Sequence, residues 1–401
     1  MNILYLSILY PQGDQNDNLY TMLVRELKQQ GHNITVVVAD EARSIDKTGL
    51  ALENGIEVLR VRVGDQFGVS FIKKGITTLK IEPLLISAIK KHLLSKNFDV
   101  VLYSTPPVTF ANVAKFCKKV YKCQSYLMLK DILPQGAVDL GLINKRGIIY
   151  KVLRRKEENL YKLSDHIGCM SQANIDYLLK HNKYLKKEKI ELFPNTIKVL
   201  PQKPKPINYV ARKKLRLPID KTIFVFGGNL GIPQGLEFLI DCIADLQNYY
   251  EAFFLIVGDG TERKNIEAKI KRLKLENVLL LQRLPKDDYD NLILECDVGL
   301  VSLDKRFTVP NYPSRTLAYM DMALPILAVT DKASDIKELL NEAQCGLWAY
   351  SGEKIGFTEQ VKNLCENKEL CIQMGKNGRR YLEEKFDVSR SVKILEDHFG
   401  K

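Results

Sequence analysis

The sequence contains no cysteine pair with CxxC spacing, although it has eight cysteines in 401 residues. Most of the cysteines lie inside apolar runs, which favours reduced, buried thiols over a disulfide framework or a zinc site. No stretch of about 18 uncharged apolar residues occurs, so the sequence predicts no membrane-spanning helix. The chain opens directly on an expected strand, without a basic region or a cleavage signal, and we therefore expect a cytoplasmic protein.

Several catalytic patterns are also missing. The turn at 254–263 (FLIVGDGTER) lacks both the third glycine of the dinucleotide fingerprint and the Walker lysine. Asp288-Tyr289-Asp290 has the DxD spacing of a metal–diphosphate site, but acidic residues just after Leu284-Pro285 also favour a helix start, and we expect no metal there. The histidines are scattered without ligand spacing: His32, His92, His166, His181 and His398.

Positive charge is concentrated in one part of the chain. Residues 51–200 carry a net charge of +13, whereas the whole chain carries +12. Such a basic face suits nucleic acid, an anionic membrane surface or a phosphorylated acceptor. No aromatic-basic motif supports nucleic acid, so we expect no such partner. The segments 71–91 and 144–162 mix Lys and Arg with aliphatic residues, which fits docking on anionic lipid or, equally, ordinary surface helices.

The length fits two domains, and strands alternate with helices in both halves, so the fold class is predicted as α/β with two doubly wound sheets. Strands are expected at 3–9, 33–38, 56–63, 100–103, 124–129, 167–170, 190–193, 222–226, 253–257, 278–282, 298–301 and 325–329. Helices are expected at 18–30, 86–94, 111–121, 148–162 and 172–181, with a helical tail over 358–398. The predicted domains are 1–199 and 213–384, joined by a proline- and lysine-rich linker at 200–212, with a helix at 385–401 packing back on the first domain.

A glycine-rich strand-to-helix turn lies at 222–237 (TIFVFGGNLGIPQGLE). An apolar β-branched and aromatic run precedes it, and an amphipathic helix follows. The glycines permit a sharp turn and a close backbone approach to a ligand, and a helix start there favours an anion. A glycine-rich turn without a ligand is the alternative.

Two further segments also combine a turn or loop with the start of a helix that carries an arginine. In the first, Gly258-Asp259-Gly260 sits between a strand and a helix that carries Arg263 in its first turn. In the second, 307–328 (FTVPNYPSRTLAYMDMALPILA), Ser314 is expected to cap a helix that begins with Arg315. A cation at a helix start opposes the helix dipole unless an anion is bound, so Arg315 indicates a phosphate site.

These motifs together resemble those of the retaining nucleotide-sugar glycosyltransferases of family 4. The matching segments are GNLG with QGLE, VGDGTER, a Leu-Pro before a short helix, PSRTLAYM and LPILA. The resemblance covers nearly the whole chain and implies the GT-B fold, with an N-terminal acceptor domain and a C-terminal UDP-sugar domain. The segment KDILPQGAVDLG at 130–141 resembles the acceptor-side loop of members that transfer N-acetylfucosamine in capsule or surface polysaccharide assembly.

The resemblance implies a metal-independent reaction without a cofactor, in which the leaving phosphate itself takes the acceptor proton. It implies a lipid-linked saccharide as acceptor, at the inner face of the cell membrane. The implied catalytic residues are Asp131 and Arg315, although Asp131 also fits a turn cap. Gln12 and Gln135 are implied on the acceptor side. The implied donor-binding residues are Gly13, Gly228, Asn229, Leu230, Gly231, Gln234, Gly258, Gly260, Arg263, Arg283, Leu284, Asn311, Ser314 and Arg315, with the main chain near Arg283-Leu284 reading the uracil.

The sequence departs from the family at its charged contacts. An acidic pair that family members often carry would fall at Pro310 and Ala318, and the second usually contacts the ribose. The diphosphate-clamping Arg and Lys correspond to Asn229 and Gln234. We expect Arg263, Arg283 and Arg315 to supply the missing positive charge. A UDP-sugar epimerase, another enzyme on the same fold and a catalytically silent partner protein are the alternatives.

Overall fold

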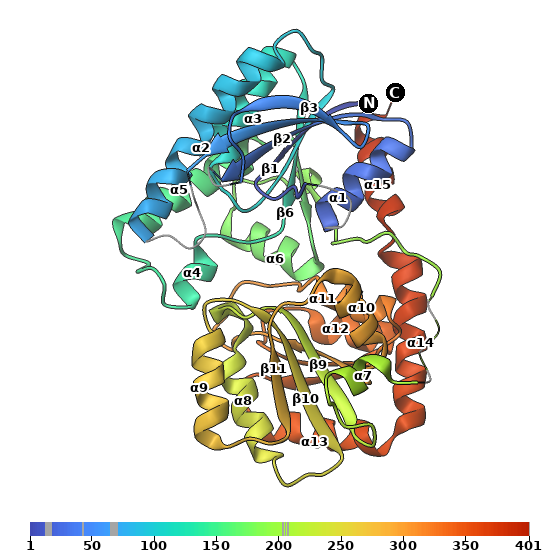
Figure 1. Cartoon of the computed structure of the whole chain (residues 1–401). Coiled ribbons are helices and arrows are strands. Elements are labelled where there is room, and N and C mark those ends of the chain that lie inside the picture. The colour runs from blue at the N-terminus through green and yellow to red at the C-terminus, as the bar shows by residue number, and fades with distance from the viewer. Residues whose placement is uncertain are drawn as a thin grey trace. The chain divides into compact units, whose positions relative to one another are not determined.

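The computed structural model describes residues 1–12, 18–41, 44–64, 71–202, 204, 206 and 208–400, with the backbone alone for 71–79. The described chain forms two compact units, which are treated separately below (Figure 1). The first unit comprises Met1–Lys198 and Val388–Lys401, and the second comprises Val199–Asp387. The segment expected as a linker, 200–212, therefore groups with the second unit.

The first unit is built on an eight-stranded sheet in the order β3-β4-β2-β1-β5-β6-β7-β8, with only the β3–β4 pair antiparallel. Its strands are β1 (Asn2–Ser7), β2 (Asn33–Glu41), β3 (Gly49–Glu53), β4 (Ile56–Val63), β5 (Val100–Ser104), β6 (Gln124–Leu129), β7 (His166–Cys169) and β8 (Ile190–Leu192). Its helices are α1 (Leu19–Gln29), α2 (Phe71–His92), α3 (Phe110–Tyr121), α4 (Gln135–Asp139), α5 (Ile148–Leu163), α6 (Gln172–His181) and α15 (Val388–Phe399). The order reverses between β1 and β5, where a doubly wound sheet binds its ligands.

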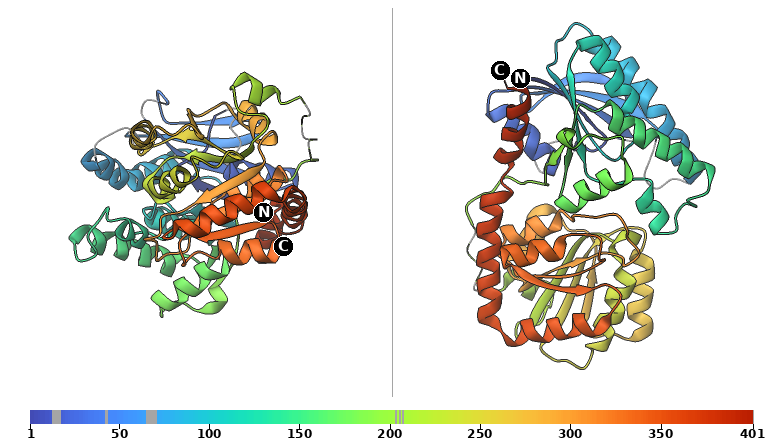
Figure 2. Two further views of the ribbon diagram at one scale, coloured as in Figure 1. Left: turned by 90° about the horizontal axis from the view of Figure 1, so that it is seen from below. Right: turned by 180° about the vertical axis from the view of Figure 1, so that it is seen from behind.

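The last helix of the chain, α15, is part of the first unit. Its apolar stripe, which includes Val388, Val392, Leu395 and Phe399, joins the buried cluster formed by α1 and the sheet. Residues at this spacing lie on one helical face, so the amphipathic pattern explains why α15 packs here. Both chain termini consequently belong to this unit (Figure 2).

The second unit has a six-stranded sheet in the order β11-β10-β9-β12-β13-β14, and every pair is parallel. Its strands are β9 (Thr222–Asn229), β10 (Ala252–Asp259), β11 (Val278–Leu281), β12 (Val298–Ser302), β13 (Ile326–Thr330) and β14 (Gly346–Tyr350). Its helices are α7 (Val210–Lys214), α8 (Leu236–Asp245), α9 (Arg263–Leu273), α10 (Lys286–Leu294), α11 (Arg315–Asp321), α12 (Ile336–Ala343), α13 (Lys354–Glu366) and α14 (Lys368–Lys385). In order of sequence this is the 3-2-1-4-5-6 arrangement of nucleotide-binding sheets.

A buried arginine explains why the expected linker belongs to the second unit. The Arg212 side chain is almost fully buried, and its Nη2 lies 2.6 Å from Asp297 Oδ2. Its Nε donates to the Glu295 carbonyl oxygen at 2.6 Å, while the Glu295 carboxylate accepts the N–H groups of Ala211 and Arg212. These bonds fix α7 on the unit because a buried guanidinium needs partners for its donors.

The predicted doubly wound α/β fold is confirmed, whereas several elements escaped prediction. The strands β3 and β14 and the short helices α4 and α7 were not expected. The helix expected at 86–94 begins much earlier, at Phe71, and contains Pro83. Within the described ranges, no helix is both long enough and apolar enough to cross a bilayer.

Candidate functional site

The glycine-rich turn of the second unit lies at the reversal point of its sheet. It follows β9, and β9 lies between β10 and β12. Ligands of doubly wound sheets bind beyond the carboxyl ends of the strands at such a point. On the β12 side, the Ser302 hydroxyl donates to the Gln234 carbonyl oxygen at 2.7 Å, which ties the turn to the end of β12.

The second glycine turn, at the end of β10, packs directly against the first. Gly258 pairs with Gly228 in register, and the Leu230 N–H donates to the Asp259 carbonyl oxygen at 2.9 Å. A Cβ on Gly258 would lie only 1.9 Å from the Gly228 oxygen, and one on Gly260 would lie 2.6 Å from the Leu230 backbone. Only glycine fits at 258 and 260, because the two backbones meet where side chains would stand.

Arg315 places the positive charge of this site beside the glycine turn. Its guanidinium lies over the Phe226 ring at 4.0 Å, and its Nη2 donates to Gln234 Oε1 at 2.6 Å. The same Nη2 lies 3.5 Å from the Cβ position of Gly228. The buried Nη1 has no hydrogen-bond partner in the described part of the chain. An unpartnered buried donor costs free energy, and this nitrogen has a hydrogen-bond donor free to accept a partner such as an anionic ligand.

Two tyrosines, Tyr319 buried and Tyr289 half-buried, pack against the glycine turn. The Tyr319 hydroxyl donates to the Val225 carbonyl oxygen at 3.0 Å and accepts the Gly227 N–H at 3.1 Å. Tyr289 Oη occupies the space above Gly227, 1.5 Å from where a Cβ would be. Burial lowers the pKa of Arg315, and the nearby tyrosines oppose that shift. Arginine nonetheless stays charged, because its ordinary pKa lies far above neutral pH.

Arg263 braces the second glycine turn. Its Nη1 donates to the Gly258 carbonyl oxygen at 2.8 Å and to the Leu281 carbonyl oxygen at 2.7 Å. The bond to Leu281 fixes the start of the loop after β11, in which Arg283 is exposed and Leu284 half-buried. Arg263 therefore links the glycine turn to the segment expected to read a base.

In the first unit, the loop after β6 carries a lysine–aspartate pair. The N–H groups of Lys130 and Asp131 both donate to Thr105 Oγ1, at 3.0 and 3.1 Å. Lys130 Nζ lies over the Phe193 ring, 5.4 Å from its centre. Burial lowers the pKa of Lys130 to about 7, so near neutral pH its amine exists in both charged and neutral forms.

The other acceptor-side candidates of the first unit are less well anchored. Gln135 opens α4, and its Nε2 donates to Asp139 Oδ1 at 2.7 Å. Gln12 is exposed in the loop after β1. Gly13 lies outside the described residues. Gln12 follows β1 and Gln135 follows β6, so both come after the carboxyl ends of their strands, where ligands of the sheet are expected.

Comparison with known protein families assigns the chain. Residues 18–199 match the model described as Glycosyltransferase Family 4, and residues 210–381 match the model described as Glycosyl transferases group 1. The chain is a GT-B glycosyltransferase. The two matches are consecutive and together take in most of both units.

Individual relatives of this glycosyltransferase are distant. It is 24% identical over 290 residues to the probable glycosyltransferase WbjE of Pseudomonas aeruginosa, covering 70% of this chain and 69% of the relative. It is 25% identical over 203 residues to the putative colanic acid biosynthesis glycosyl transferase WcaI of Escherichia coli K12, covering 48% and 47%. The crystal structure of Anabaena HepE in complex with UDP-glucose matches with a TM-score of 0.72, at 18% identity over 99% of each chain.

The glycosyltransferase uses some of the predicted donor residues to hold its own fold. The Leu230 side chain is buried in the core, and its backbone oxygen accepts the Glu262 N–H at 2.9 Å. Asn311 Nδ2 donates to the Val309 carbonyl oxygen at 3.1 Å. Ser314 precedes α11, but its side chain makes no capping bond, so the expected cap is wrong; its backbone is already helical rather than extended.

The structure places the departures from the family pattern near Arg315. Pro310 is buried, whereas Ala318 is half-buried on α11, one turn after Arg315. Asn229 is exposed at the end of β9, and Gln234 is bonded to Arg315. Gln234 thus holds the arginine in place at the position where a family lysine is expected.

The DxD-spaced segment belongs to the first turns of α10. Asp290 forms an ion pair with Lys286, 2.5 Å apart, and Asp288 is exposed. The tyrosine between them is the residue that packs over Gly227. This segment therefore contributes a half-buried aromatic side chain that supports the glycine turn.

Sequence reasoning missed Lys130, Tyr289 and Tyr319 as members of these sites. Lys130 was visible as the first residue of the KDILPQG segment, and Tyr289 as the centre of the DxD-spaced triplet. Neither pattern indicates that Lys130 contacts Phe193 or that Tyr289 packs over Gly227, because these contacts join residues that are distant in the sequence.

Proposed function

We propose that this glycosyltransferase is a retaining, metal-independent enzyme that uses a UDP-sugar. The observation that carries the proposal is the Arg315 guanidinium, which is stacked on Phe226 with Nη1 unpartnered among the described residues. A half-buried cation beside a glycine turn suits a diphosphate. HepE, which shares the fold, was crystallised with UDP-glucose.

The proposed chemistry depends on stabilising the leaving group. As the glycosidic bond breaks, negative charge grows on the diphosphate, and a fixed cation there lowers the barrier. Arg315 supplies that cation, while the lack of a side chain at Gly228, beside the guanidinium, lets the backbone approach the phosphates closely. The leaving phosphate takes the acceptor proton on the same face of the sugar, which accounts for the retained configuration.

The proposed acceptor is a polyprenyl-diphosphate-linked saccharide in bacterial surface polysaccharide assembly. WcaI is described as acting in colanic acid biosynthesis, and the loop at 130–141 resembles that of N-acetylfucosamine transferases. We propose N-acetylfucosamine or a similar 6-deoxy-N-acetylhexosamine as the sugar. Asp131 and Lys130, anchored through Thr105, are the candidates for orienting the acceptor.

A turnover assay tests the proposed function. The protein is incubated with a panel of UDP-sugars and a lipid-diphosphate saccharide, with chelator present, and the products are separated. The proposal expects UDP release, a lengthened glycolipid and the donor's anomeric configuration in the product. An epimer without UDP release would support an epimerase, and an inert protein would support the silent partner that Pro310 and Ala318 suggest.

An exposed apolar and basic patch in the first unit supports the proposal of a lipid-linked acceptor. Four large apolar side chains near the start of α5 are exposed, and exposed cations surround them. The apolar residues are Leu142, Ile148, Ile149 and Val152, and the cations are Lys145, Arg146, Lys151 and Arg155. An apolar patch within basic residues suits the interface of an anionic bilayer.

Replacing both Ile148 and Ile149 with aspartate tests this patch. We expect binding to anionic vesicles to fall by about tenfold or more, because the apolar insertion is lost and two charges repel the lipid. Flotation with anionic and neutral vesicles measures the effect. Ile355→Asp is the matched control, since Ile355 is 65% exposed in the second unit. Equal flotation of the double variant and the parent would contradict the proposed patch.

A further inference from the structure

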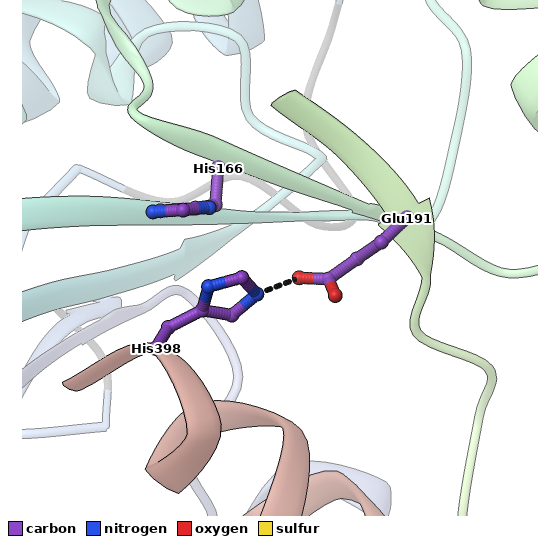
Figure 3. Close-up of side chains that lie close together, drawn as sticks. All are labelled: His166, Glu191 and His398. Atoms are coloured by element: carbon purple, nitrogen blue, oxygen red, sulfur yellow. Dashed lines mark hydrogen bonds and ion pairs between the residues drawn. The ribbon is translucent and has the colours of Figure 1, made fainter. Parts of the chain in front are cut away.

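Three metal-ligating side chains of the first unit meet outside the sites described above. His166 begins β7, Glu191 is the central residue of β8, and His398 is the penultimate residue of α15 (Figure 3). One ligand atom from each residue lies within 4.8 Å of those of the other two. These residues are separated by up to 232 positions in the sequence, so only the fold brings them together.

Strand register explains why the three side chains share one face of the sheet. In the parallel pair of β7 and β8, Gly168 lies opposite Glu191, and His166 is two residues before Gly168. Side chains two residues apart on a strand point to the same face. At Gly168, between them, the position of a Cβ is taken by Phe193 and by the Tyr126 hydroxyl. The helix α15 covers this face and presents His398 there (Figure 3).

The carboxylate of the cluster is already oriented by its neighbours. Glu191 Oε1 accepts from the Tyr126 hydroxyl at 2.9 Å and lies 2.7 Å from His398 Nε2. The rings of His166 and His398 are 4.0 Å apart between their centres. Neither nitrogen of His166 has a hydrogen-bond partner in the described ranges. Two imidazoles and a carboxylate that is oriented by a further hydrogen bond, here from Tyr126, form a ligand set typical of zinc.

The spacing leaves room for one ion. A tetrahedral zinc ion holds nitrogen and oxygen ligands at about 2.0–2.2 Å, which sets the ligand atoms roughly 3.3 Å apart. The contact between His398 and Glu191 is shorter than this, at 2.7 Å, so these two side chains must move slightly apart to admit the ion, while all three ligand atoms already lie within 4.8 Å of one another. His166 and Glu191 are half-buried and His398 is more accessible, which leaves the fourth position to water.

We propose that His166, Glu191 and His398 bind one divalent transition ion of the zinc class, which fastens α15 to the edge of the first unit's sheet. The imidazoles select zinc, nickel, cobalt or copper over magnesium and calcium, which prefer oxygen ligands. The site is structural and lies on a different part of the unit from Lys130 and Asp131. It does not depend on the proposed function, and the donor diphosphate needs no ion from it.

Calorimetry with Zn²⁺ on the full chain, freed of metal beforehand, tests the proposal. We expect one ion per chain with micromolar affinity, no comparable heat with Mg²⁺, and a higher melting temperature with Zn²⁺. His398→Ala, His166→Ala and Glu191→Gln should each weaken binding by about tenfold or more. His181→Ala is the matched control, because His181 is exposed in the same unit and its ring Nδ1 bonds to the Tyr177 carbonyl oxygen of its own helix.

Spectroscopy separates this site from adventitious binding by thiols. With Co²⁺ we expect only the weak visible bands of nitrogen and oxygen ligands, whereas intense near-ultraviolet bands would identify a cysteine and overturn the proposal. Binding that survives in the His166→Ala/His398→Ala double variant would also overturn it, as would absence of stoichiometric binding by the parent. Thermal melting of each variant without metal shows whether it is folded. If a histidine variant unfolds, the loss of Zn²⁺ binding in Glu191→Gln still tests the proposal.

Discussion

Arg315→Ala is expected to lower kcat/KM by about 30- to 1000-fold, equivalent to about 2–4 kcal/mol of transition-state stabilisation. The glycine turn has Asn229 and Gln234 where cationic clamps are common, so the stacked guanidinium is the charge placed directly beside Gly228. Steady-state kinetics with the preferred UDP-sugar measure the effect. The loss should fall mainly on kcat, because the charge of the leaving diphosphate grows in the transition state.

Two further substitutions make this result specific. Arg315→Lys keeps the charge but loses the planar contact with Phe226 and the second donor, so we expect an intermediate activity. Arg306→Ala is the matched control, because Arg306 is exposed and paired with Asp304 in the preceding loop. Melting curves confirm that each variant is folded. Unchanged kcat/KM in folded Arg315→Ala would remove this residue from the donor site.

Gly258→Ala is expected to abolish measurable UDP-sugar binding and to lower the free energy of unfolding by about 4 kcal/mol or more. The added methyl would lie 1.9 Å from the Gly228 oxygen, so the two glycine turns must separate. Their separation would also break the bond from the Leu230 N–H to the Asp259 carbonyl oxygen. Urea unfolding and calorimetric titration measure the two effects.

Gly356→Ala is the control for this prediction. Gly356 lies in α13 of the same unit, where a Cβ meets only Ala349 at an ordinary 3.8 Å. Alanine favours a helix over glycine, so the control should be as stable as the parent or slightly more stable. Full UDP-sugar affinity in Gly258→Ala would mean that the contact between the turns is not needed for binding.

The fold was predictable from the sequence because its strands are strongly patterned. The run Thr222–Phe226 is β-branched and aromatic, and it became the buried part of β9. The strand β14 was not predicted because it begins with a glycine and four of its five residues are half-buried, so it has no continuous buried apolar run. β3 pairs antiparallel at the sheet edge and is largely exposed, so its residues show little burial pattern.

The sequence indicated several residues that the structure brings together at the two glycine turns, but not what their side chains contact there. The conflict between a cation and a helix start indicated Arg315, and the structure places that residue beside the turn. Its stacking on Phe226 and its bond to Gln234 depend on how β9 and α11 pack, which sequence spacing does not encode. The contacts of Arg263 could not be predicted from sequence spacing either. We expected Arg263 to bind a phosphate, and its Nη1 donates to two backbone carbonyl oxygens.

The glycine turn has no charged side chain of its own, and Arg315 is the proposed source of the positive charge that binds the diphosphate. Calorimetric titration of the parent and Arg315→Ala with UDP tests this claim most directly, because it needs neither the sugar nor the acceptor to be known. The account predicts saturable binding of UDP to the parent and binding weakened by at least about tenfold in the variant. Equal affinity in the two proteins, or no binding of UDP by the folded parent, would contradict it.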